Sequence, residues 1–260
     1  MLQVTCTMTD TLAYGLLLIV TGFAAGIINT LAGGGTNLTL PALMVMGMPP
    51  EIANATNRVA VFMQSLTALV SFKRHRKLPM EDAGLVLLPT LIGGLFGAVA
   101  AAFIASEHLK PLLLGAMLTM TLIMLVKPDI VVPPPGTPPR RVRETPASWF
   151  WLLIAGFYGG FVQAGVGFIL ITALAGTLRY DLVQTNALKV LCVVAFTALA
   201  LAVFIAQGLI QWLPGLTLAV GSMAGAHIAI KFAVSAKPAT LKWLLFLMTL
   251  AGTVAALLSD

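Results

Sequence analysis

The stretches GFAAGIINTLAGGGTN, residues 22–37, and GFYGGFVQAGVG, residues 156–167, are apolar and interrupted by glycine in a shared pattern. Each begins with Gly-Phe, continues to an amide side chain (Asn29 or Gln163) and reaches a cluster of glycines. A Thr-Asn pair follows each stretch, at 56–57 and at 185–186. A duplicated hydrophobic unit with paired glycine interruptions predicts a membrane protein of two repeats that meet at one site.

The composition places the chain in a lipid bilayer. It is 59% hydrophobic and 9% charged, whereas soluble domains contain about 25% charged residues. The first apolar run, residues 12–31, can span the bilayer and has no basic start before it, so we expect it to be retained rather than cleaved. Cys6 and Cys192 have no partner at metal-site or redox spacing, so no metal, cofactor or disulfide is expected. The basic residues lie beside apolar spans, which favours the lipid bilayer over nucleic acid as their partner.

Ten apolar segments divide into two series of five. They cover residues 12–31, 36–48, 52–72, 83–106 and 109–127, then 149–166, 168–178, 183–206, 209–232 and 238–258. The second and the seventh are shorter than the roughly 20 residues that span hydrocarbon. Residues 128–148 hold seven of the fifteen prolines, which disfavours a helix. We therefore expect a first transmembrane repeat in 1–127, a Pro- and Arg-rich cytoplasmic linker in 128–148 and a second transmembrane repeat in 149–260.

The distribution of basic residues favours ten crossings. Lys and Arg near span ends accumulate on the cytoplasmic side. With ten crossings, twelve basic residues are cytoplasmic and only Lys110 is outside, whereas eight spans with two re-entrant segments give eight against five. Five crossings per repeat is odd, so the second repeat is inverted relative to the first. The sequence predicts an all-α polytopic membrane protein with two inverted five-segment repeats, and eight spans with two re-entrant segments is the alternative.

The short segments and their glycine clusters supply one group of candidate site residues. A helix of 11–13 residues covers only about 16–20 Å, so residues 33–35 and 165–167 are expected to be unwound, buried and satisfied by protein or a cavity. Thr36 is expected to cap the second segment, and free N–H groups at that helix start suit an anion. The candidates for substrate binding here are Gly33, Gly34, Gly35, Thr36, Asn37, Gly165 and Gly167.

Arg58 and Lys189 lie inside apolar segments, whereas all nine acidic residues fall at or beyond segment ends. A charge at mid-bilayer costs about 2.5–3.5 kcal/mol on insertion scales, so it should face the bundle interior or a cavity. With no acid placed to neutralise these cations, a small anionic substrate is the expected partner. The alternatives are snorkelling to the interface or bonding to backbone carbonyls.

Polar residues at paired positions suit hydrogen bonding to an oxyanion, although bundles also use such groups between helices. These further candidates are Asn29, Thr56, Asn57, Gln163, Thr185 and Asn186.

Small residues indicate where helices pack closely. GxxxG pairs, which allow close helix approach, occur in matching segments of the two halves, at 22/26, 93/97, 156/160 and 221/225. The chain has no HExxH, no GxSxG and no acidic residue inside an apolar segment, so no enzyme is expected. These features favour an anion carrier that works by alternating access, with an anion channel as the alternative.

Residues 22–57, GFAAGIINTLAGGGTNLTLPALMVMGMPPEIANATN, join a glycine-rich turn to a proline-containing short segment, a Gly-x-Pro-Pro step and Ala-x-Ala-Thr-Asn. This block resembles the first half of the sulfite exporter TauE/SafE family. GFYGGFVQAGVGF, residues 156–168, and TNALK, residues 185–189, resemble its second repeat. The resemblance covers essentially the whole chain. It implies a multi-pass carrier of the bacterial inner membrane that moves sulfite, sulfonates such as sulfoacetate or related organic anions, often outward.

One position departs from the family pattern. The family often places a basic residue directly after Thr-Asn in the first repeat, and Arg58 supplies it here. In the second repeat a basic residue commonly follows the threonine, whereas this chain has Asn186 there and Lys189 three residues later. The departure allows a different substrate.

Overall fold

The computed structural model describes residues 8–32, 34–74, 78–126, 137–232, 250, 253–256 and 258. Every regular element in these ranges is helical, which confirms the all-α prediction. The first half contains α1 (Met8–Ala32), α2 (Thr36–Val45), α3 (Pro50–Arg74), α4 (Ala83–Phe103) and α5 (Ser106–Val126). The second half contains α6 (Pro146–Phe161), α7 (Val166–Ile171), α8 (Leu182–Ala206) and α9 (Trp212–Phe232), with a 3-10 turn η1 (Val142–Glu144) before α6 and a π-helical turn η2 (Thr172–Thr177) after α7.

In the described part of the chain, three helices are long and apolar enough to cross a membrane by length and composition: Ala13–Thr30 in α1, Ala83–Phe103, which is α4, and Val183–Ala206 in α8. This fits a membrane protein, and exposed apolar side chains such as Phe96 on α4 and Val220 on α9 fit a lipid-facing surface. The predicted tenth segment, residues 238–258, lies largely outside the described residues. The choice between ten crossings and eight stays a prediction.

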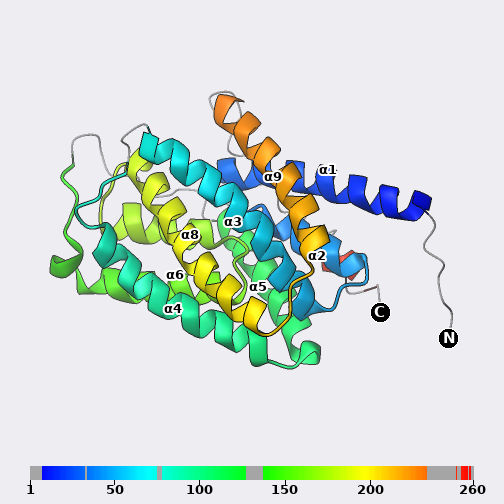
Figure 1. Cartoon of the computed structure of the whole chain (residues 1–260). Helices are drawn as coiled ribbons and strands as arrows, with labels where there is room; N and C mark the ends of the chain where they lie inside the picture. Colours follow the sequence, from blue (N-terminus) through cyan, green and yellow to red (C-terminus); the bar gives the residue numbers. More distant parts are fainter. Residues whose placement is uncertain are drawn as a thin grey trace.

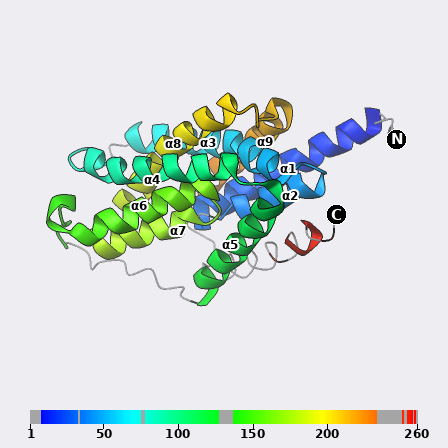
Figure 2. The ribbon, with the colours of Figure 1, turned by 90° about the horizontal axis from the view of Figure 1, so that it is seen from below.

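Helices α3 and α8 lie side by side near the centre of the bundle and run in opposite directions (Figure 1). α9 packs against α3 on one side, and α4 packs against α8 on the other. The outer layer is formed by α1 on α9 and α6 on α4, and Figure 2 shows α4 and α6 side by side. The end of α3 and the start of α8 therefore meet at the same end of the bundle.

Glycines of the GxxxG pairs bring these outer helices into backbone contact. In the α1–α9 pair, a Cβ added at Gly26 would overlap the backbone of Ser222, and one at Gly225 would overlap that of Phe23. In the α4–α6 pair, the same holds for Gly97 against the carbonyl of Phe157. Close backbone approach replaces the hydrophobic driving force that helices lack in lipid. The predicted close packing is confirmed for both pairs.

The first break in the fold separates α1 from α2. Gly34 and Gly35 are buried, and the backbone N–H groups of Asn37 and Leu38 donate to their carbonyls at 3.1 Å. A side chain at Gly35 would come within 2.7 Å of the Asn29 Cβ, so only glycine lets α2 fold back this closely on α1. The residue that precedes α2 as its cap is Gly35, with no side-chain capping bond. The expectation that Thr36 caps the helix is wrong, because Thr36 is already its first residue. Gly33 lies outside the described residues.

The second break separates α6 from α7 and lies earlier in the chain than predicted. Residues 162–165 are non-helical, with the backbone in the left-handed region at Gln163 (φ 67°) and Gly165 (φ 74°). α7 begins at Val166, so the expectation that residues 166–167 are unwound is wrong. The turn ends once Gly165 reverses the chain, and the residues after it are free to be helical. α6 itself begins at Pro146, three residues before the predicted start at 149, because proline is favoured in the first turn of a helix.

Candidate functional site

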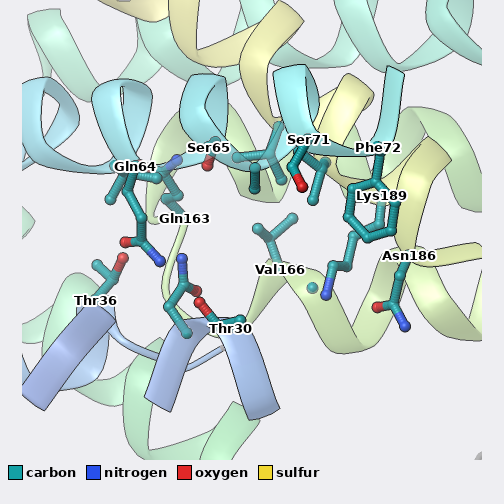
Figure 3. Close-up of a pocket in the computed structure, with 16 residues that line it drawn as sticks. Thr30, Thr36, Gln64, Ser65, Ser71, Phe72, Gln163, Val166, Asn186 and Lys189 are labelled. Carbon is teal, nitrogen blue, oxygen red and sulfur yellow. The ribbon is translucent and has the colours of Figure 1, made fainter. Parts of the chain in front are cut away.

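A cavity of about 440 Å³ lies between α3 and α8 and is closed on its other sides by the two breaks (Figure 3). It is bordered by the last residues of α1, the start of α2, one face of α3, the α6–α7 break and one face of α8. The lining residues are Asn29, Thr30, Thr36, Val61, Gln64, Ser65, Ala68, Ser71, Phe72, Gln163, Val166, Gly167, Asn186, Lys189, Val190 and Val193. Both halves of the chain therefore contribute to one site, and none of these lining residues is acidic.

Lys189 is the one basic residue among those that line the cavity. Its side chain is 9% exposed, and Figure 3 shows its amine directed toward Val166 and Asn186. Within the part of the chain that the structure describes, no carboxylate forms an ion pair with this amine. The register of α8 explains the position, because residues 186, 189, 190 and 193 share one helical face. The cavity thus holds a buried lysine with no carboxylate from the described residues paired to it.

Amides and hydroxyls gather at the other side of the cavity. Figure 3 shows Thr30, Thr36, Gln64 and Gln163 grouped together there, with Val166 between this group and Lys189. The Gln163 Nε2 donates to the Thr197 Oγ1 at 2.8 Å, and the Gln64 Nε2 donates to the Gly26 carbonyl at 3.4 Å. The first bond connects Gln163 to α8, and the second connects Gln64 to α1. The arrangement offers neutral hydrogen-bonding groups and no second charge.

Arg58 is fully buried and lies outside the cavity lining. Its guanidinium donates to the carbonyl of Gly159, to that of Gly160 at 2.8 Å and to that of Phe161 at 3.1 Å. These are the last carbonyls of α6, which have no intrahelical partners because the helix breaks there. The Asn54 Nδ2 also donates to the Phe161 carbonyl, at 2.9 Å, and the Phe204 ring lies 5.7 Å from the guanidinium carbon. Arg58 therefore supplies hydrogen-bond donors to the carbonyls at the end of α6. This matches the alternative considered for it above, in which the side chain bonds to backbone carbonyls instead of an anion.

The remaining predicted residues divide between the cavity and other contacts. Asn29, Thr36, Gln163, Gly167, Asn186 and Lys189 line the cavity, whereas Gly34, Gly35, Asn37, Thr56, Asn57, Arg58, Gly165 and Thr185 do not.

Several of the residues outside the lining have partners elsewhere in the bundle. The Asn37 amide donates to the Thr121 hydroxyl at 2.6 Å, and the Thr56 hydroxyl accepts from the backbone N–H of Gln211 at 3.0 Å. Asn57 accepts from the Thr39 hydroxyl at 2.7 Å. These side chains hold helices together, which is the other role available to polar groups in membrane bundles.

The sequence analysis missed a polar stripe on α3. Gln64, Ser65 and Ser71 line the cavity together with Phe72, yet they were not candidates. Positions 61, 64, 65, 68, 71 and 72 repeat at intervals of three and four, which is the spacing of one helical face. Small and polar residues on one face of an otherwise apolar helix were the signal that could have identified this wall of the site.

Comparisons with known proteins cover most of the chain. The family model for the sulfite exporter TauE/SafE matches residues 18–256. A probable membrane transporter protein of Haemophilus influenzae is 29% identical over 84% of this chain and 85% of its own length. The probable membrane transporter protein ORF9 of a Sinorhizobium species is 26% identical over 96% of this chain and 95% of its own, and YfcA of Escherichia coli, with the same description, is 28% identical over 88% and 83%. The chain belongs to the sulfite exporter TauE/SafE family.

Proposed function

We propose that the protein is a secondary transporter that exports sulfite, a sulfonate or a related small organic anion across the bacterial inner membrane. The observation that carries the proposal is the Lys189 amine in a cavity whose lining, within the described ranges, contains amides and hydroxyls but no carboxylate. A lysine held in the membrane interior costs about 2.5–3.5 kcal/mol on insertion scales unless a partner compensates it. A bound anion supplies that partner, and amide and hydroxyl donors stabilise its oxygens.

The different surroundings of Arg58 and Lys189 indicate which of the two binds the anion. Arg58 has three backbone carbonyls as acceptors and is compensated by the protein itself. Lys189 has no such set among the described residues, and it lines the space between the two halves. We therefore assign direct anion binding to Lys189, with Asn29, Thr36, Gln163, Gly167 and Asn186 around it. Arg58 acts by holding the end of α6 in place.

The pairing of helices supports two related repeats and alternating access. α1, the first helix of one half, packs against α9, the fourth of the other, and α6 packs against α4 in the equivalent way. The cavity lies where the breaks of the two halves meet, as expected when one repeat moves against the other around a fixed site. This exchange of equivalent contacts supports the inverted-repeat interpretation.

The position of the cavity along α3 supports a cytoplasm-facing state. Its α3 wall runs from Val61 to Phe72 and ends beside Lys73 and Arg74, which the positive-inside rule places in the cytoplasm. Arg58 lies beyond the other end of this wall, where the helices are closely packed. A cavity reached from the cytoplasm is the state that loads a substrate for export.

Transport by purified protein in liposomes tests the proposal. Vesicles loaded with sulfite or a sulfonate should exchange it for labelled external anion with saturation, and Lys189→Met should reduce this exchange at least about tenfold. Lys110→Met removes a lysine of α5 outside the cavity and serves as the matched control. Wild-type exchange by Lys189→Met would refute the assignment of the site. Ohmic single-channel steps in planar bilayers would favour a channel instead.

A further inference from the structure

The two ends of the cavity differ in chemistry, and this difference restricts the ligand. Lys189 and Asn186 lie at one end, and Thr36, Gln64 and Gln163 lie at the other (Figure 3). Val166 lies between the two ends. A ligand that fills this space therefore meets a cation first, then apolar surface, then neutral hydrogen-bonding groups.

The length of the cavity exceeds that of a single inorganic oxyanion. Its lining positions on α3 extend from Gln64 to Phe72, and eight residues of α-helix rise about 12 Å. The volume of about 440 Å³ lies within the range of about 300–1,000 Å³ that is typical of sites for organic ligands. An ion of sulfite size at Lys189 would leave the amide end unoccupied. The dimensions favour a ligand with a carbon skeleton between two polar ends.

The charge of the lining fixes the charge of the ligand. Among the described residues, one lysine and no carboxylate line the cavity, and Arg58 is engaged by carbonyls of α6. One anionic group is balanced by Lys189, whereas a second one would be buried at the amide end without a counter-charge. A cationic group there would also lack a partner. Burial of an unpaired charge is much less favourable than burial of a hydrogen-bonded neutral group.

We propose that this site selects organic monoanions that carry one sulfonate or similar anionic group at one end and a neutral hydrogen-bonding group at the other. The anionic group binds Lys189, and a hydroxyl or amide of the ligand binds the group of Thr36, Gln64 and Gln163. This inference rests on the proposed transport function and specifies its substrate class. It excludes dianions and zwitterions of the same length as good substrates.

Three two-carbon sulfonates whose far ends carry different groups, and therefore different charges, test the inference. At neutral pH isethionate ends in a neutral hydroxyl, sulfoacetate in a carboxylate and taurine in an ammonium group. Each is used, together with sulfite, to compete for exchange in liposomes that contain the full-length protein. We expect isethionate to compete at a concentration at least about tenfold lower than sulfoacetate, taurine or sulfite, which corresponds to about 1.4 kcal/mol.

The outcomes separate this inference from the proposed function. Preference for sulfoacetate or taurine, or transport of sulfite alone, overturns the inference of a monoanion substrate. In each of these cases, transport that depends on Lys189 still supports the proposed transport function. If none of the four anions is exchanged by correctly folded protein, both proposals fail.

A charge variant at the amide end provides a second readout. Gln64→Glu keeps the shape of the side chain and places a carboxylate where the far end of the ligand binds. It should weaken competition by isethionate and sulfoacetate and improve that by taurine, whose ammonium group then gains a partner. Gln64→Leu is the control, because it removes the amide without adding charge and should weaken isethionate without favouring taurine. An unchanged order of the three sulfonates in Gln64→Glu would remove this end from the site.

Discussion

Replacing Arg58 by methionine should destabilise the fold and leave anion binding intact, because the guanidinium lies on backbone carbonyls and not in the cavity. Methionine retains an unbranched side chain but removes every donor. The Phe161 carbonyl keeps the Asn54 amide as a partner. The carbonyls of Gly159 and Gly160 lose theirs, so two buried acceptors are left unsatisfied.

The magnitude follows from these two acceptors. A buried polar group that loses its partner costs about 1–3 kcal/mol, which gives about 2–6 kcal/mol for the pair. Removing a guanidinium from the membrane interior offsets part of this loss, since burial of that charge is itself unfavourable. We expect a net destabilisation of about 2 kcal/mol, which lowers Tm by about 4–8 °C in a chain of this size.

Thermal unfolding in detergent, with and without saturating isethionate or sulfite, measures both effects. A ligand that binds only the folded protein raises Tm, so Arg58→Met should start lower and show the wild-type increase. Lys189→Met should show the opposite: a higher Tm without ligand, because an uncompensated buried charge is removed, and no further increase with ligand. Arg140→Met, at an exposed arginine, is the control. A wild-type Tm in Arg58→Met combined with loss of the ligand-induced increase would refute the reasoning and place Arg58 at the anion.

Two further predictions concern glycines, and both are measured by thermal unfolding. Gly97→Ala should lower the free energy of unfolding by about 1–3 kcal/mol, because the added methyl group forces α4 and α6 apart. Gly115→Ala is the control and should be neutral or stabilising, because no atom lies within 4 Å of its added Cβ. Equal stability of the two variants would contradict the close packing of α4 and α6. Gly165→Ala should be more destabilising than Gly208→Ala. Both variants lose about 1–2 kcal/mol because alanine disfavours a left-handed backbone. Only at Gly165 does the added methyl group also come within 2.5 Å of the Met120 side chain. Equal losses would show that the α6–α7 turn tolerates the added atom.

Much of the fold could be predicted from the sequence, because its signals are local. Nine of the ten predicted segments correspond to helices of the structure, since uninterrupted apolar runs in a bilayer must satisfy their own backbone as helices. The glycine clusters gave the positions of both breaks, and the GxxxG pairs marked the helices that pack closely. The second break begins three residues and ends two residues earlier than predicted, because Gln163 and Gly165 both adopt a left-handed backbone and the chain after Gly165 returns to helix.

The candidate site was predicted only in part. Six of its predicted residues line the cavity, and the polar stripe on α3 was overlooked because its residues are spread over several turns. Asn37, Thr56 and Asn57 looked equivalent to cavity residues in the sequence. Their helical register turns them toward Thr121, Gln211 and Thr39 instead.

The sequence by itself determined that this is a helical membrane protein with broken helices and two basic residues in apolar surroundings, and it predicts two related repeats. Only the tertiary structure decided which of those cations is available to a ligand. The carbonyls that engage Arg58 lie 101 to 103 residues away along the chain, and they are free to accept only because α6 ends at Phe161. Among the described residues, no backbone carbonyl accepts a hydrogen bond from Lys189. The compensation of a buried charge depends on groups brought close by folding, and local sequence carries no record of that proximity.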